Sequence, residues 1–131
     1  MLSKKASLIT LNSCLTCINT IHSVFGKSDQ LNIKWPNDIY LNNSKKLAGI
    51  KAYSEISGNT FFCNVGIGMN FDNNIAEIDP KFASMKDLVN FSHYNISKKE
   101  FTEELVGNLH ENIFNKFGVE NVDKIVEDCN N

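Results

Sequence analysis

The chain has 131 residues, with 13 basic residues against 15 acidic residues, so its formal net charge is −2 at neutral pH. This length predicts one domain with a core of its own. The near-neutral charge excludes a general electrostatic attraction to nucleic acid or to an anionic membrane surface. No run of the sequence reads as long and apolar enough to span a bilayer. We therefore expect neither a nucleic-acid partner nor a membrane-spanning segment.

The first residues combine two features of a secretory signal peptide, because Lys4 and Lys5 precede an apolar stretch. Asn12, Thr16 and Asn19 interrupt that stretch, and no small-residue cleavage site follows it clearly. We therefore expect a cytoplasmic protein.

The four cysteines raise the question of metal or redox chemistry. Cys14 and Cys17 form a C-x-x-C motif, whereas Cys63 and Cys129 stand apart from it. A zinc site of this kind needs a second pair of cysteine or histidine ligands, which the sequence lacks. We interpret Cys14 and Cys17 as small apolar residues of a helix, in a protein from a reducing compartment.

The first predicted element is an amphipathic helix from about Lys4 to Phe25. Its apolar side chains recur at spacings of three and four residues, which is the period of one helix face. Gly26 follows at the position where glycine commonly ends helices. We expect this face to cover the apolar side of a sheet. Its members are Leu8, Leu11, Leu15, Ile18, Ile21 and Phe25.

Two short strands are predicted next, at about residues 30–34 and 39–41, with a Trp35-Pro36 turn between them. Proline fixes its own φ and keeps the preceding residue extended, so the chain changes direction here. We expect Trp35 to pack in the core and not to contact a ligand.

A long β-hairpin is the most informative predicted element. Two runs with period-2 alternation flank Gly58-Asn59, a pair that is typical of a two-residue hairpin turn. Pairing outward from this turn, and sorting side chains by the pleat, gives one apolar face that we expect to be the core. The predicted pairs are Ile56–Phe61, Ala52–Val65, Ile50–Ile67 and Gly49–Gly68. The apolar face contains Ala48, Ile50, Ala52, Ile56, Phe61, Cys63, Val65, Ile67 and Met69.

The opposite face of the hairpin is small and polar. Glycine inside a strand weakens it, and often marks the close approach of a ligand or of another backbone. Lys46 lies just beyond Gly49, and Asp38 follows the Trp35-Pro36-Asn37 corner, so we predict a site for a flat, phosphate-bearing ligand. The residues of this face are Gly49, Lys51, Tyr53, Glu55, Asn64, Gly66, Gly68 and Asn70.

Two capping boxes predict helices in the second half of the chain. The first opens at Ser84 and leads into a short helix through Val89, and the second opens at Ser97 and leads into a longer helix that ends at Gly118. A last short helix is expected at about Val122 to Asp128. One face of the longer helix consists of Phe101, Leu105, Leu109, Ile113 and Phe117. The order of elements predicts an α+β fold, with a mostly antiparallel sheet and helices packed on one of its faces.

Three blocks of this sequence together resemble the central part of a biotin–protein ligase catalytic domain. The blocks are Lys34-Trp35-Pro36-Asn37-Asp38, Lys46-Leu47-Ala48-Gly49-Ile50 and Gly66-Ile67-Gly68-Met69-Asn70, and their spacing also matches. Residues 83–88 and the helix after them resemble the next segment of these ligases. The family implies a fold similar to that of class II aminoacyl-tRNA synthetases, incomplete in this chain.

The resemblance implies ATP-dependent ligation of biotin to an acceptor lysine of a carboxylase through biotinyl-5′-adenylate. It implies that Lys46 holds the biotin carboxylate and the adenylate phosphate together; alternatively, Lys46 is a solvated turn lysine. Asp38 is expected to hold Mg²⁺ or to orient a lysine, or else only to cap its turn. The three glycines are a surface for the ligand, or else a site of hairpin twist or a bulge. The predicted binding set consists of Lys34, Asn37, Lys46, Gly49, Lys51, Gly66, Gly68 and Asn70.

The chain also departs from the family. These ligases carry an upstream loop rich in glycine and arginine, whereas this sequence has no such loop and no arginine. The upstream strands of the biotin pocket and the C-terminal β-domain of many members are missing as well. Lys51 stands where the family usually has an aliphatic residue against the biotin ring, and a charge there costs free energy unless it is paired, for example with Glu55.

From these departures we expect a fragment, a truncated copy or a degenerate copy that is inactive alone and self-associates through an unpaired sheet edge. The alternative is a non-catalytic binding module that retains the ligase fold. Transfer of lipoate or octanoate matches the motifs less well.

Overall fold

The fold is organised around a five-stranded sheet, seen in a computed structural model that describes residues 2–88, 90–114 and 121–127. The strands follow one another in space as they do in sequence, in the order β1-β2-β3-β4-β5. The first four are antiparallel to their neighbours, and β5 is parallel to β4. The strands are β1 (Leu31–Lys34), β2 (Asp38–Leu41), β3 (Lys45–Ser57), β4 (Thr60–Met69) and β5 (Asn121–Glu127).

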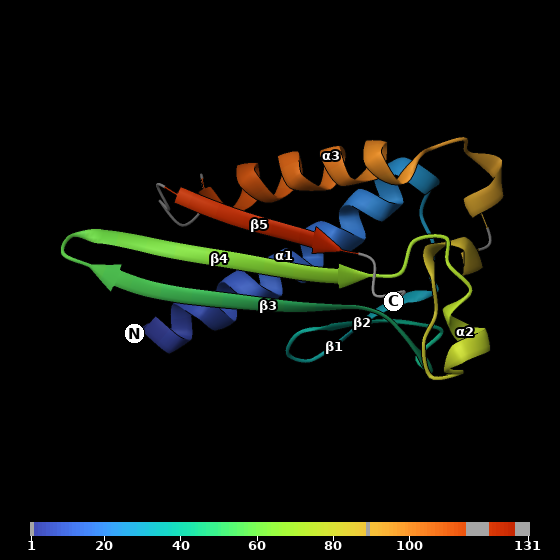
Figure 1. The fold of residues 1–131 in the computed structure, drawn as a ribbon, viewed down its shortest axis with the longest axis horizontal. Helices are drawn as coiled ribbons and strands as arrows, with labels where there is room; N and C mark the ends of the chain where they lie inside the picture. Colours follow the sequence, from blue (N-terminus) through green and yellow to red (C-terminus); the bar gives the residue numbers. More distant parts are fainter. Residues whose placement is uncertain (1, 89, 115–120, 128–131) are drawn as a thin grey trace.

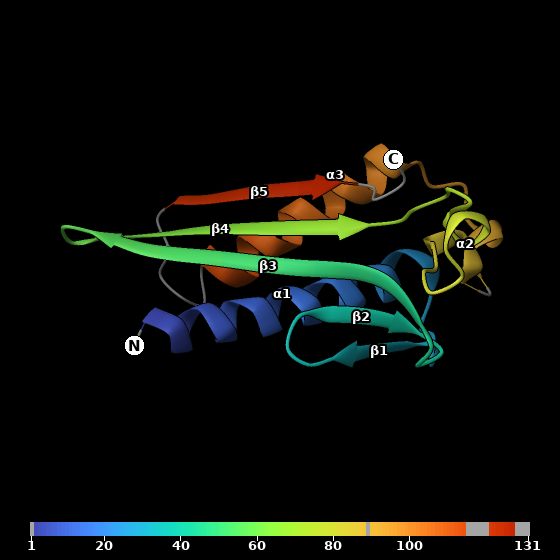
Figure 2. The ribbon, with the colours of Figure 1, turned by 60° about the horizontal axis from the view of Figure 1, so that its bottom comes forward.

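Two helices pack on the same face of this sheet, α1 (Leu2–Phe25) and α3 (Lys98–Leu109), the latter continued by a π-helical turn (His110–Phe114). Figure 2 shows both helices behind the sheet. A short α2 (Ile75–Ile78) and two 3₁₀ turns (Met85–Asp87 and Phe91–His93) occupy the connection between β4 and α3 (Figure 1). The predicted α+β class, with a mostly antiparallel sheet covered by helices on one face, is confirmed.

The register of the β3–β4 hairpin is the predicted one. Ser57 pairs with Thr60 across the two-residue turn, and Gly58 has a positive φ of 63° that suits this turn. The pairs Ile56–Phe61, Ala52–Val65, Ile50–Ile67 and Gly49–Gly68 all form as predicted. The apolar face is buried from Ala48 to Ile50, but Ile56 is 64% exposed, so its assignment to the core is wrong. The reason is coverage, because the tip of the hairpin extends past the end of α1 in both views (Figures 1 and 2).

Helix α1 begins and ends close to the predicted bounds, and Gly26 follows it with a positive φ of 88°. Its buried face differs from the predicted stripe, because Leu8 and Leu15 are about half exposed. The helix packs against both β3 and α3, so its buried side includes polar residues with internal partners. Its buried residues are Ile9, Ser13, Cys14, Thr16, Cys17, Thr20, Ile21 and Phe25.

Hydrogen bonds satisfy the buried polar side of α1. Asn112 donates its Nδ2 hydrogen to the Thr16 hydroxyl at 2.9 Å, and Asn108 donates to the Thr20 hydroxyl at 2.9 Å. A buried hydroxyl without such a partner would cost free energy, so these contacts account for polar residues on the buried side of this amphipathic helix. Cys14 and Cys17 are buried and unpaired, as expected for small apolar residues of a helix.

By length and composition alone, residues Leu8–Phe25 of α1 qualify as a candidate membrane span. The expectation that no run is apolar and long enough is therefore wrong by this criterion. Buried positions make up 44% of the segment, and core helices and N-terminal signal sequences meet the same criterion, so it is weak evidence for a membrane.

The end of the chain differs from the prediction. A last helix was expected at about Val122 to Asp128, but residues Asn121–Glu127 form β5, which pairs with β4 from Phe62 to Gly68. The β-branched residues in this segment favour a strand, and the free edge of β4 supplies the hydrogen-bonding partner. In the order β1-β2-β3-β4-β5, β4 is therefore an inner strand. Phe117, Gly118 and Asp128 lie outside the described residues.

The second capping box has the predicted contacts. The Glu100 amide donates to the Ser97 hydroxyl at 3.0 Å, and the Ser97 amide donates to the Glu100 carboxylate at 3.1 Å. The hydrogen bonds with Ser97 lower the pKa of Glu100. At the first box, the Ser84 amide donates to the Asp87 carboxylate at 3.0 Å, but the turn it opens is a 3₁₀ turn of three residues. Val89, the predicted end of this helix, lies outside the described residues.

Candidate functional site

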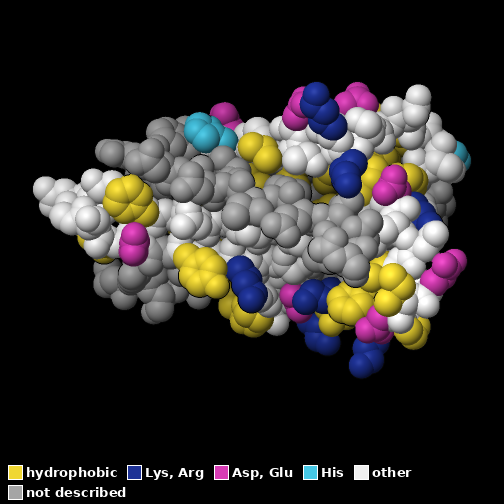
Figure 3. Space-filling model, viewed as in Figure 1, with side chains coloured by type: hydrophobic (Ala, Val, Ile, Leu, Met, Phe, Trp, Pro, Cys, Tyr) yellow, Lys and Arg dark blue, Asp and Glu magenta, His cyan; other side chains and the backbone are white. Residues whose placement is uncertain are grey.

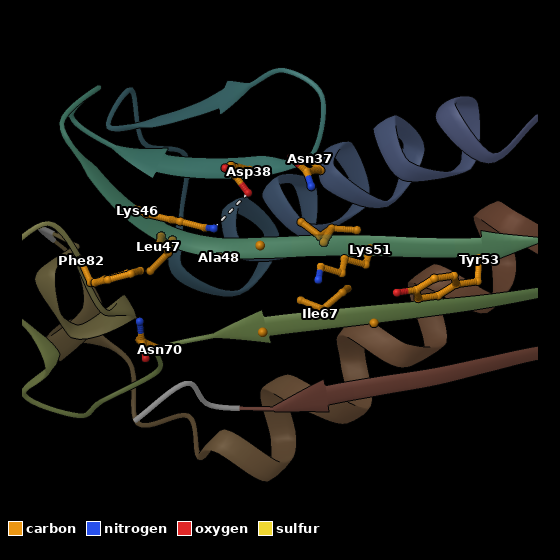
Figure 4. A pocket seen from close by; sticks show the side chains of 14 residues that line it. Asn37, Asp38, Lys46, Leu47, Ala48, Lys51, Tyr53, Ile67, Asn70 and Phe82 are labelled. Carbon is orange, nitrogen blue, oxygen red and sulfur yellow. Dashed lines mark ion pairs between the residues drawn. The ribbon is translucent and has the colours of Figure 1, made fainter. Parts of the chain in front are cut away.

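A cavity of about 410 Å³ lies on the sheet face opposite the helices (Figure 4). All the predicted site residues except Lys34 line it. Lys34 is the last residue of β1, and its ammonium lies 4.8 Å from the centre of the Tyr40 ring. The lining residues are Asn37, Asp38, Lys46, Leu47, Ala48, Gly49, Ile50, Lys51, Tyr53, Gly66, Ile67, Gly68, Asn70 and Phe82.

An ion pair marks one end of the cavity. The Lys46 Nζ lies 3.3 Å from the Asp38 Oδ1, and the two side chains are 35% and 24% exposed. Asp38 is directly opposite Gly49 in the β2–β3 pairing, so the carboxylate projects on the face of the sheet where Gly49 has no side chain. The ammonium is thus held at a defined place and still reaches the cavity.

The absence of a side chain at Gly49 makes room for the ammonium. A Cβ atom built on Gly49 would lie 3.2 Å from both Cε and Nζ of Lys46, and 3.5 Å from the Asp38 Oδ1. At Gly66, a Cβ would meet no described atom closer than the Lys51 carbonyl oxygen at 3.9 Å, so the described residues leave the space above it open. Gly49 therefore has a steric role toward Lys46, whereas Gly66 leaves the surface free. We call the backbone of Gly49, Gly66 and Gly68 the glycine surface.

A β-bulge, which the sequence analysis missed, turns Lys46 toward the cavity. Ile39 pairs with Ala48 but Tyr40 pairs with Lys46, so Leu47 is an extra residue on β3. By strict alternation Lys46 would share the core face of Ala48 and Ile50. Bulges re-aim side chains in this way. The sequence contained one signal of the bulge. Alternation places Lys46 on the same face as the buried even-numbered residues that follow it, where a charged side chain does not fit.

The loop after α2 fixes the backbone of Lys46. The Lys46 amide donates to the Lys81 carbonyl oxygen at 2.9 Å, and the Ala83 amide donates to the Lys46 carbonyl oxygen at 2.9 Å. Phe82, between them, forms a parallel bridge with Lys46 and lines the cavity. No local pattern could reveal Phe82, because it reaches the site from a loop distant in sequence.

Asn70, a member of the predicted binding set, lines the cavity and also has contacts within the protein. Its side chain is buried, donates to the Ala83 carbonyl oxygen at 3.3 Å, and accepts from Asn73 at 3.1 Å. These contacts connect the end of β4 to the loop that holds Lys46. Phe71, next in the chain, packs against Phe25 and Phe101 with ring centres 6.4 Å and 5.7 Å away, which anchors this end of the cavity to the core.

The Trp35-Pro36-Asn37 corner supplies a second wall. The Asn37 carbonyl oxygen accepts from the Ile50 amide at 2.8 Å, and the Asn37 side chain points into the cavity (Figure 4). Trp35 is 66% exposed, so the expectation that it packs in the core is wrong. The corner holds its shape through backbone pairing, and the indole does not contribute to the hydrophobic core.

Lys51 lines the cavity from the middle of β3, opposite Gly66. Its side chain is exposed, and within the described part of the chain it forms no ion pair with Glu55. The expected partial compensation by Glu55 is therefore wrong. In the close view, the Lys51 nitrogen is turned toward the end of the cavity that holds Lys46 (Figure 4).

Cys14 lies beneath the ion pair and is not a nucleophile at neutral pH. Burial, with a smaller contribution from the Asp38 carboxylate, raises the pKa of its thiol to about 11. Burial also raises the pKa of Cys17, with a smaller contribution from Cys14. Both thiols stay protonated, so the C-x-x-C motif offers no thiolate to the site.

Comparisons with known proteins identify the family of this chain. Residues 1–70, which include all three sequence blocks, match the model of the biotin/lipoate A/B protein ligase family. The chain therefore belongs to this family, and the resemblance inferred from the sequence blocks is confirmed. The match ends at Asn70, so the extension of the resemblance over residues 83–88 stays a prediction.

Two relatives are similar over a short segment. The chain is 42% identical to the human biotin–protein ligase over 43 residues, which are 33% of this chain and 6% of the human protein. It is 44% identical to biotin–protein ligase 2 of Arabidopsis thaliana over 45 residues, which are 34% of this chain and 13% of that protein. The matched segments thus represent only a small part of either relative.

Proposed function

We propose that this chain provides the carboxylate- and phosphate-binding part of a biotin–protein ligase site. The reaction would start with attack of a biotin carboxylate oxygen on the α-phosphorus of ATP. A new P–O bond forms, the bond to the bridging oxygen breaks, and pyrophosphate leaves. The amine of an acceptor lysine, on a carboxylase domain, then attacks the acyl carbon of biotinyl-5′-adenylate, and AMP leaves as the amide forms and the amine loses a proton.

The placement of the Lys46 ammonium is the observation that carries this proposal. The first step brings a carboxylate against the negative oxygens of a phosphate, and the second develops negative charge on the acyl oxygen and on the leaving AMP. A fixed cation at the point where charge develops lowers the barrier most. The 3.3 Å contact with Asp38, together with the backbone bonds of Lys46 to the loop, supports a preorganised position. Lys46 would bind the carboxylate and the α-phosphate, and Asp38 would orient it.

The remaining predicted residues have supporting roles in this proposal. The glycine surface lets the flat acyl-nucleotide approach the backbone, because no Cβ atoms stand in its way. Asn37 would contact the ligand from the corner, and Asn70 would hold the loop through its contacts with Ala83 and Asn73. Lys34, outside the cavity, would add only positive potential.

A resident Mg²⁺ ion does not fit the described residues. Asp38 is the one carboxylate among the lining residues, and it is already engaged by Lys46. The described residues also contain no group of three or more His, Cys, Asp or Glu side chains that could hold a metal ion. Magnesium keeps several waters and commonly arrives with substrate phosphates. Any Mg²⁺ in the reaction would therefore enter as part of the ATP substrate.

The same site supports an alternative, a non-catalytic module that binds the ligand without activating it. The strands β3 and β4 form the floor of the cavity (Figure 4). We expect these 131 residues to have little or no ligase activity by themselves. This expectation applies both to the purified chain and to the chain in the cytoplasm, where we expect the protein to occur. Self-association through the short edge strand β1 remains part of this proposal.

Calorimetry with biotin, with and without ATP, tests the proposed function. We expect biotin to bind and ATP to strengthen its binding, because both ligands would meet at Lys46. Release of pyrophosphate and transfer of labelled biotin to a carboxylase acceptor domain separate an enzyme from a binding module. A preference for lipoate or octanoate over biotin would place the chain in the other branch of its family, and binding of none of these acids would refute the proposal.

A further inference from the structure

One charge of the cavity is not compensated. The charged lining residues are Lys46, Asp38 and Lys51, and the first two form an ion pair. Lys51 therefore leaves the described part of the cavity with one excess positive charge. Glu55, the nearest acid along the same strand face, is not among the lining residues.

The positions of Lys46 and Lys51 define the direction in which a bound ligand would extend along β3. Along β3, the cavity face presents Lys46, through the bulge, then Gly49, Lys51 and Tyr53. The α-carbon of Lys51 is about 7 Å from that of Gly49, at the rise of an antiparallel strand. An acid whose carboxylate meets Lys46 would therefore extend over Gly49 and bring its far end to Lys51.

The surroundings of Lys51 leave its ammonium available to such a ligand. Its partner across the strands is Gly66, which has no side chain, and the space above Gly66 is open. A second hollow, of about 340 Å³, shares Asn37, Ile50, Lys51 and Tyr53 with the first cavity, so Lys51 stands between the two.

We propose that Lys51 is a specificity-determining residue that selects acids with a carbonyl oxygen at the end distant from their carboxylate. This inference rests on the proposed function, in which Lys46 binds the carboxylate. An apolar tail laid on Lys51 would remove water from the ammonium without replacing its hydrogen bonds, which is unfavourable. A ureido carbonyl, as in biotin, would accept a hydrogen bond from it. A purely aliphatic acid such as octanoate would be rejected, because sites with polar groups discriminate against ligands that leave them unpaired.

The test compares the binding of biotin and of octanoate by calorimetry in the full 131-residue chain, with ATP present. In the wild-type chain we expect biotin to bind at least tenfold more tightly than octanoate, on the scale of a hydrogen bond to a charged group. Lys51→Leu should reduce this ratio by about tenfold and raise the affinity for octanoate. Lys51→Arg, which keeps the charge, should keep the preference.

Lys45→Leu is the matched control, because Lys45 is exposed on the same strand, is absent from the cavity lining, and loses the same charge. It should leave the ratio unchanged. A ratio in Lys51→Leu within twofold of the wild-type ratio would overturn the role of Lys51 and leave the proposed function standing. Equal binding of biotin and octanoate by the wild-type chain would also overturn the role of Lys51 and leave the proposed function standing. Failure of the wild-type chain to bind either acid would overturn the proposed function and this inference with it.

Discussion

The two ends of the β3–β4 hairpin have the same alternating pattern but different surroundings. At the Lys46 end, Ala48 and Ile50 are buried under α1, and the opposite face forms the cavity. At the turn end, Ile56 is 64% exposed although it has the same parity as Ile50. Alternation therefore determines which face a side chain occupies, and only the helix layer determines whether that face is core.

The same comparison separates a regular region from a functional one. Toward the turn, the pairing runs without interruption from Lys51–Gly66 to Ser57–Thr60. Toward Lys46, a bulge on β3 and a loop bonded to the Lys46 backbone interrupt the regular pattern. Lysine, acidic and hydrophobic side chains meet on the surface over β3 and the neighbouring β1 and β2 strands (Figure 3). The candidate chemistry lies where the regular pattern ends.

The largest expected effect is on stability, and it tests how deeply side chains are buried at the two ends of the β3–β4 hairpin. Ile50→Ala should destabilise the fold by about 3 kcal/mol, because a fully buried side chain leaves a cavity. Ile56→Ala should change the free energy of unfolding by less than about 0.5 kcal/mol, since the side chain is mostly exposed. Chemical denaturation monitored by circular dichroism measures both. Equal destabilisation by the two variants would show that the turn end is covered in solution.

The second largest expected effect concerns ligand binding by the Lys46 ammonium. Lys46→Ala should weaken binding of a non-hydrolysable biotinyl-adenylate analogue by about 100-fold, and should abolish adenylate formation in a chain that carries the upstream loop. The reason is that, among the described residues, Lys46 is the one cation of the cavity that is held by an ion pair and by loop bonds. Calorimetry measures the affinity, with Lys45→Ala as the control. Unchanged affinity in Lys46→Ala would leave Lys46 with no more than a structural role.

A smaller effect tests the spacing between Gly49 and Lys46. Gly49→Ala should weaken analogue binding by about tenfold, because the new methyl group displaces the ammonium from its place beside Asp38. Gly107→Ala is the control, since nothing lies within 4 Å of a Cβ there and the residue is in the last turn of α3, which the π-helical turn continues. It should leave binding unchanged and raise the stability by about 0.5–1 kcal/mol. Equal binding by both variants would contradict the steric role of Gly49.

The smallest expected effect tests the layer beneath the cavity. The pKa of the Cys14 thiol is raised from 9.0 to about 11, so the unfolded chain ionises first as the pH rises. The contribution of Cys14 to stability should be complete below pH 9 and should decline between pH 9 and 11. Thermal unfolding of the wild-type chain and of Cys14→Ala across this range measures it. An equal loss of stability with rising pH in the wild-type chain and in Cys14→Ala would show that Cys14 is not the source of this loss.

Much of this fold could be predicted from the sequence, because local rules determine it. The turn at Gly58, the register of the hairpin, the end of α1 at Gly26 and the capping box at Ser97 all follow from spacing or from glycine geometry. Eight of the lining residues were predicted as well, seven from the three blocks and Lys51 from its place on the polar face of the hairpin.

The rest depended on contacts that no local pattern encodes. Trp35 is exposed because no part of the chain that the structure describes covers its corner, and Leu8 is half exposed because α1 presents another side to β3 and α3. The strand at Asn121–Glu127 owes its conformation to the free edge of β4. The position of Lys46 depended on a single extra residue, Leu47, whose effect appears only when β2 and β3 are aligned.

The most direct test is a titration of the isotopically labelled chain with biotin and ATP, followed by the backbone amide resonances. If an acyl-nucleotide lies on the glycine surface, the amides of Gly49, Gly66 and Gly68 will shift together and saturate at one ligand concentration, while those of Gly58 and Gly107 stay in place. Binding that shifts other amides and leaves these three unchanged would contradict the account.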